Sequence, residues 1–197
     1  NWNGLKFLNL KGEFLSKKQS AEVFNFRADF NKEISSQSEN TVSIKNIDYK
    51  EKHISLILDL PDVDVNAIKE KKFKIIVDGI NSSGGIFVPF LLEKLGVEVI
   101  PLNCCPDGNF SHNPEPLPKN LQQLSSLVSS NKADLGIAVD PDVDRLVFVC
   151  EDGSFFGEEY TIVAIAKYIL LNRKGNTVCN LSSSNALKDI TLQYGGL

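Results

Sequence analysis

The residues best suited to chemistry are three aspartates at alternate positions, followed at once by an arginine. The aspartates are Asp140, Asp142 and Asp144, the arginine is Arg145, and the apolar segment 135–139 precedes them. Three carboxylates this close together repel one another unless a cation lies between them, and oxygen ligands select Mg²⁺ or Ca²⁺ over softer metals. Arginine cannot ligate a cation, but it binds phosphate through a forked pair of hydrogen bonds. The loop therefore predicts phosphoryl chemistry assisted by a divalent cation.

Three other interpretations fit parts of this loop. A calcium EF-hand would need glycine at the sixth position, where this chain has Arg145. A phosphatase of the haloacid-dehalogenase type would use Asp140 as nucleophile and Asp142 as acid/base, but that family has Thr or Val where Asp144 stands. A solvated acidic turn in a non-catalytic interaction domain would need no ligand. The phosphatase and the interaction domain stay open as alternatives.

The elements that must position this loop alternate between strand-like and helix-like patterns. Apolar runs predict buried strands at 73–77, 97–102, 135–139 and 146–150. A further strand is expected to begin at Val178. Helices are expected at 16–30, 48–60, 64–71, 84–95, 121–128, 158–171 and 187–194, although 54–58 alone also fits a strand. This alternation is typical of a three-layer α/β/α sandwich with a mostly parallel sheet, whose ligand sites lie at the carboxyl ends of the strands.

Composition and charge exclude several classes of protein. The 197 residues include 21 basic and 25 acidic ones, and a net charge of −4 argues against bulk attraction to nucleic acid or to anionic membranes. No apolar run approaches the roughly 18 residues of a spanning helix, and no signal peptide opens the sequence. The four cysteines lack C-x-x-C spacing, which favours a cytoplasmic location. Because the sequence contains no methionine, we expect a piece of a longer protein.

Several segments together resemble the α-D-phosphohexomutases, the phosphoglucomutase/phosphomannomutase family. The loop 140–145 is similar to the family's metal loop, whose common form is Asp-Gly-Asp-Gly-Asp-Arg. Residues 77–85 resemble the strand and turn that open the second domain, and 113–117 and 156–160 are similar to segments of one branch. Residues 2–7 resemble the segment that follows the catalytic serine loop. The likeness covers nearly the whole chain.

The resemblance implies an isomerase that moves a phosphate between the 1- and 6-positions of a hexose. Such enzymes work through a phosphoserine and a bisphosphorylated sugar, with glucose 1,6-bisphosphate as activator. It also implies that Asp140, Asp142 and Asp144 ligate Mg²⁺ and that Arg145 contacts the phosphate of the substrate. The family's serine loop would precede this chain, so no catalytic serine is expected here. The hexose phosphate itself stays open, with phosphoglucosamine mutase as the nearest alternative.

By the same resemblance, the chain spans parts of three domains. Residues 1–42 would be the end of the first domain with a polar linker at 31–43, residues 43–153 the second domain with the metal loop, and residues 154–197 the start of the third. The remaining domains of the same polypeptide are then the expected partners, and the isolated chain is expected to be catalytically silent.

Two other segments fit a structural role as well as a functional one. The stretch from Ser111 to Pro114 matches the letters of the family's serine loop, but it follows the predicted opening strand of the second domain. Ser111 and His112 are therefore expected to be ordinary surface-loop residues. The turn 81–85 suits a phosphate cradle, but it also suits a tight connection from strand to helix.

Overall fold

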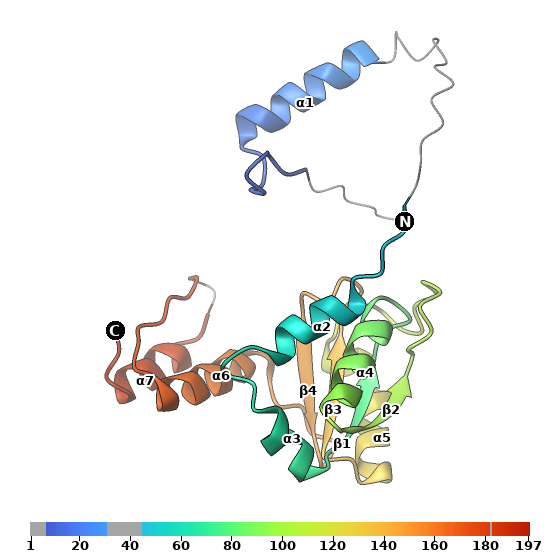
Figure 1. Cartoon of the computed structure of the whole chain (residues 1–197), viewed down its shortest axis with the longest axis vertical. Coiled ribbons are helices and arrows are strands. Elements are labelled where there is room, and N and C mark those ends of the chain that lie inside the picture. The colour runs from blue at the N-terminus through green and yellow to red at the C-terminus, as the bar shows by residue number, and fades with distance from the viewer. Residues whose placement is uncertain (1–6, 31–44, 182) are drawn as a thin grey trace. The chain divides into compact units, whose positions relative to one another are not determined.

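A computed structural model describes residues 7–30, 45–181 and 183–197 (Figure 1). The chain divides into two compact units, Asn1–Ile47 and Asp48–Leu197, and each is described by itself. The predicted linker at 31–43 lies outside the described residues, and so does most of the segment 2–7. The expected domain boundaries after residues 42 and 153 stay predictions.

In the first unit, a short antiparallel contact is followed by a capped helix. A single antiparallel β-bridge joins Leu8 to Phe14. Helix α1 (Lys17–Phe30) begins with a reciprocal capping box, in which Ser16 N donates to Gln19 Oε1 at 2.9 Å and Gln19 N donates to Ser16 Oγ at 3.3 Å. These two bonds satisfy backbone and side-chain groups at the start of the helix.

The second unit is built on one four-stranded sheet in the order β2-β1-β3-β4. Its strands are β1 (Lys74–Asp78), β2 (Glu98–Leu102), β3 (Leu135–Val139) and β4 (Leu146–Cys150). Strand β1 pairs in parallel with β2 and β3, whereas β4 runs antiparallel to β3. The short loop 140–145 forces this reversal, because a parallel return needs a crossover of a dozen or more residues. Strand β2 is an edge strand, with Pro101 opposite Val77.

Helices cover both faces of this sheet (Figure 1), which confirms the predicted three-layer sandwich. Helices α2 (Lys50–Leu58), α3 (Val65–Lys71) and α4 (Gly84–Lys94) pack on the face that carries Ile75 and Val77. Helix α5 (Gln122–Asn131) covers the other face through Leu124, against Ile76. Neighbouring residues of β1 thus point to opposite layers, as strand geometry requires. The segment 54–58, which fitted either element, is helical.

The C-terminal part of the described chain contains helices α6 (Glu158–Asn172) and α7 (Ala186–Gln193), close to their predicted bounds. The strand expected from Val178 is wrong: the side chain is 95% exposed, and the described residues from 173 to 181 form no strand. Apolar side chains alone do not make a strand, because a strand also needs a neighbour for its backbone hydrogen bonds. No helix in the described ranges has both the length and the apolar character required to cross a bilayer.

Candidate functional site

The acidic loop lies at the carboxyl edge of the parallel strands, where it joins β3 to β4. Asp140 is buried at 6% exposure, whereas Asp142 and Asp144 are exposed. One carboxylate oxygen from each aspartate lies within 4.8 Å of the other two. The structure therefore brings together the three predicted ligands. All three donors are carboxylate oxygens, which suit a hard divalent cation, and the two exposed side chains can rotate to close the ligand set.

Two hydrogen bonds from backbone amides of the same loop hold Asp140 in place. Val143 N donates to Asp140 O at 3.1 Å, and Arg145 N donates to Asp140 Oδ1 at 3.0 Å. Val143 has a φ of +61°, a conformation that a β-branched residue adopts only when its surroundings impose it. Asp140 thus both shapes the loop and contributes an oxygen to the acidic cluster.

The turn after β1 holds the acidic loop from outside. Ser82 Oγ and Ser83 Oγ both donate to Pro141 O, each at 2.8 Å. At Gly84, where α4 begins, an added Cβ would lie 2.3 Å from Val139 Cγ2, so a larger residue would push α4 away from β3. These contacts favour the tight connection over the phosphate cradle for the turn 81–85, because both hydroxyl protons are directed to a carbonyl.

Arg145 lies between the acidic cluster and the loop that follows β2. Its Nη1 donates to Glu115 Oε2, and its Nε is 3.8 Å from Asp144 Oδ1. The negative charge of Glu115, followed by those of Asp140 and Asp144, raises the pKa of Arg145, so the guanidinium stays charged. The side chain is half exposed and borders the acidic cluster. Its predicted role in binding phosphate stays a prediction.

A buried polar cluster beside the site was not expected from the sequence. Asp78, the last residue of β1, is 2% exposed and accepts hydrogen bonds from Ile80 N at 3.0 Å and Asn103 Nδ2 at 3.1 Å. His112 Nε2 lies 3.0 Å from the other carboxylate oxygen of Asp78. The prediction that His112 is an ordinary surface residue is therefore wrong, whereas Ser111 is exposed as expected. The sequence contained one signal for this cluster, namely that an aspartate, Asp78, ends a buried strand. A buried carboxylate needs hydrogen-bond partners.

A second residue, Asn81, ties the same loop to the turn after β1. Its Oδ1 accepts from Cys105 N at 3.2 Å, its Nδ2 donates to Asn109 O at 2.9 Å, and its backbone carbonyl accepts from Gly108 N at 3.0 Å. The loop from 103 to 117 is thus anchored at several points near the acidic cluster.

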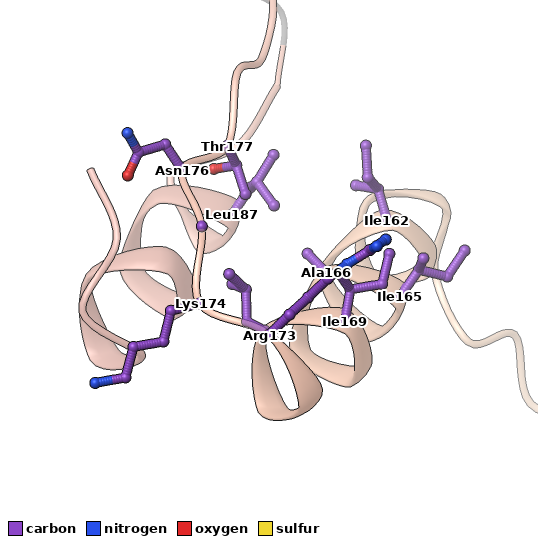
Figure 2. Close-up of a pocket in the computed structure, with 11 residues that line it drawn as sticks. Ile162, Ile165, Ala166, Ile169, Arg173, Lys174, Asn176, Thr177 and Leu187 are labelled. Atoms are coloured by element: carbon purple, nitrogen blue, oxygen red, sulfur yellow. The ribbon is translucent and has the colours of Figure 1, made fainter. Parts of the chain in front are cut away.

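A separate groove of about 400 Å³ lies between α6 and α7 (Figure 2). Isoleucines 162, 165 and 169 of α6 line one side, and Leu187 of α7 lies across from them. None of its lining residues is acidic, and none of the predicted site residues lies there. Its aliphatic walls are unsuited to holding a divalent cation, so the groove is not the candidate site.

Cys104 lies in contact with the sheet, and its environment predicts low reactivity. Its Sγ is 3.2 Å from Leu102 O and 3.4 Å from Val77 O, and burial raises the pKa of the thiol. A raised pKa leaves less thiolate at a given pH. In a Cys105→Ser chain at about pH 8, we expect iodoacetamide to label Cys104 at least about 10-fold more slowly than the exposed Cys179. Timed labelling followed by peptide mass spectrometry measures this ratio. Equal rates in the folded chain would contradict the prediction, and equal rates in guanidinium are the control.

Comparison with known proteins supports the resemblance found in the sequence. The family model described as phosphoglucomutase/phosphomannomutase, alpha/beta/alpha domain II, matches residues 51–153, just over half of the chain. A phosphoglucomutase/phosphomannomutase of Thermococcus kodakarensis is 34% identical over 198 residues, which cover 98% of this chain and 42% of that protein. A probable phosphoglucosamine mutase of Methanopyrus kandleri is 33% identical over 197 residues, covering 99% of this chain and 42% of that protein.

A solved structure agrees with these sequence relationships at the level of the fold. The crystal structure of a phosphoglucomutase/phosphomannomutase family protein from Burkholderia thailandensis matches with a TM-score of 0.69 and 24% identity. The match covers 95% of this chain and 39% of that one. The chain spans 42% of the length of the two curated relatives described above. The matched domain II contains the whole acidic loop and the turn that holds it, and the chain belongs to the phosphoglucomutase/phosphomannomutase family.

Proposed function

We propose that this chain is part of a phosphohexomutase, an isomerase that moves a phosphoryl group between the 1- and 6-positions of a hexose phosphate. In this proposal Asp140, Asp142 and Asp144 hold Mg²⁺, and Arg145 contacts the phosphate. The observation that carries the proposal is the convergence of three carboxylates within 4.8 Å at the carboxyl edge of the sheet. The family match supports it, because the similar proteins are named as mutases of phosphorylated sugars.

Each residue of the loop has a separate task in this proposal. A bound Mg²⁺ would supply positive charge to stabilise the negative charge of the transferring group. Asp140 is fixed by the backbone of Arg145, so its carboxylate is oriented before any ligand arrives. The exposed Asp142 and Asp144 complete the set by rotation of their side chains. Arg145 offers a guanidinium whose planar donors match two phosphate oxygens.

The wider activity follows from the family and is proposed for the parent protein. We propose a phosphoserine as phosphoryl donor in the parent protein and glucose 1,6-bisphosphate as activator. The hydroxyls of Ser82 and Ser83 are poor substitutes, since both already donate to Pro141 O. Glucose and mannose phosphates are the proposed substrates, glucosamine phosphate is the second candidate, and the proposed location is the cytoplasm.

The experiment that tests the cation site uses Mn²⁺ as a paramagnetic probe for the Mg²⁺ position. We expect the wild-type chain to bind Mn²⁺ in competition with Mg²⁺. The double variant Asp142→Asn, Asp144→Asn should bind it at least about 10-fold more weakly, since two ligand charges are lost. Electron paramagnetic resonance of unbound Mn²⁺ gives the affinity directly.

The control for this experiment is Glu151→Gln, which removes an exposed carboxylate beyond the end of β4 and outside the cluster. It should change the Mn²⁺ affinity by less than about 2-fold, because exposed charges at a distance are screened by salt. A wild-type chain that does not bind Mn²⁺, or a double variant with wild-type affinity, would contradict the proposed metal site.

A further inference from the structure

Glu115, from the loop that follows β2, accepts a hydrogen bond from the guanidinium of Arg145. We propose that Glu115 is a positioning residue, which keeps Arg145 from occupying the carboxylates and so leaves them available to a divalent cation. The inference rests on the proposed cation site and adds to it a residue from a different loop. The ion pair between Glu115 and Arg145, which lie 30 residues apart in the sequence, would then have a role in cation binding.

The need for such a residue follows from the position of Arg145. Its backbone N already donates to Asp140 Oδ1 at 3.0 Å, so its side chain starts beside the cluster. Its Nε forms a long ion pair of 3.8 Å with Asp144 Oδ1, without a hydrogen bond, while Nη1 donates to Glu115 Oε2. A guanidinium this close to several carboxylates would otherwise form a bidentate pair with one of them. In such a pair the guanidinium of Arg145 would compete with the metal ion for the same carboxylate oxygens.

The backbone of Glu115 is held by hydrogen bonds that do not involve Arg145. Glu115 N donates to Asn113 Oδ1 at 3.0 Å, and Asn120 Nδ2 donates to Glu115 O at 2.8 Å. Three residues earlier along the chain, His112 contacts the buried carboxylate of Asp78, which ties the loop to the end of β1. Both partners of the ion pair are about half exposed, so the pair itself contributes little to stability. An anchored glutamate in a pair of small energy suits a positioning role better than a stabilising one.

A double-mutant cycle on Mn²⁺ affinity tests this proposal. Glu115→Gln should weaken Mn²⁺ binding about 5-fold, because the released guanidinium turns to the aspartates. In an Arg145→Gln background no competitor remains, so adding Glu115→Gln should change the affinity by less than about 1.5-fold. The thermal midpoint should stay within about 1 °C of wild type for Glu115→Gln, since exposed ion pairs contribute little. A purely structural role would shift the midpoint and leave the Mn²⁺ affinity unchanged.

Each remaining outcome decides the question. An equal loss of affinity from Glu115→Gln in both backgrounds would overturn the proposal, because Glu115 would then act through its own charge on the cation. Unchanged affinity in Glu115→Gln would also overturn it, while leaving the cation site itself intact. Absence of Mn²⁺ binding by the wild-type chain would overturn both the site and this proposal. Glu151→Gln again serves as the matched loss of one exposed carboxylate.

Discussion

Replacing Gly85 by alanine should lower the free energy of unfolding of the second unit by about 3 kcal/mol. A Cβ at this position would lie 2.7 Å from Cys104 Cα and 2.9 Å from Cys104 C and O. These are backbone atoms, so α4 and the end of β2 would have to move apart. The better helix propensity of alanine recovers only about 1 kcal/mol. Denaturant unfolding followed by circular dichroism measures the difference.

The matched control for this change is Gly175→Ala. An added Cβ at Gly175 would meet no atom within 4 Å, and this glycine is not among those with positive φ. We expect a change of less than about 0.5 kcal/mol in the free energy of unfolding. If Gly85→Ala were as stable as Gly175→Ala, the close approach of α4 to Cys104 would be wrong. The turn that holds the acidic loop would then need a different explanation.

Removing the buried carboxylate of Asp78 should also have a large effect on stability. Asp78→Ala leaves three donors without their acceptor, namely the backbone N of Ile80 and the side chains of Asn103 and His112. Each buried donor that loses its partner costs about 1–3 kcal/mol, and the exposed ones cost less. We therefore expect the free energy of unfolding to fall by about 3 kcal/mol, measured by denaturant unfolding.

His112→Ala and the double variant complete this test. His112→Ala should cost about 2 kcal/mol, because Asp78 keeps its other two donors. The double variant should cost less than the sum of the single changes by about 1 kcal/mol or more, since both remove the same contact. Strictly additive effects would show that His112 and Asp78 do not interact in solution.

The sheet and most of its helices could be predicted because their signals are local. Strands β3 and β4 have the predicted bounds, 135–139 and 146–150, since each is an apolar run between polar or turn residues. The three aspartates could also be placed together from the sequence, because they share one short loop. Their convergence within 4.8 Å needs no contact between distant segments.

The contacts that surround this loop could not be predicted, because they join segments far apart in the sequence. Ser82 and Ser83 reach Pro141 across more than 50 positions, and His112 reaches Asp78 across 34. Neither residue type indicates its partner, since a serine or histidine in a loop suits solvent equally well. The strand wrongly predicted from Val178 has the opposite cause. Its local pattern is apolar, but among the described residues no strand lies beside it to pair with.

Strand β2, at one border of the sheet, has a consequence for how this molecule behaves at high concentration. An open strand edge offers unpaired amide and carbonyl groups to other chains, which is a common route to aggregation. Pro101, the fourth of the five residues of β2, has no amide hydrogen to offer, and Glu98 and Lys74 place an ion pair of 3.5 Å at the start of the β1–β2 ladder. The edge is thereby interrupted for an incoming strand, so the sheet is protected against growing from one copy of the protein into the next.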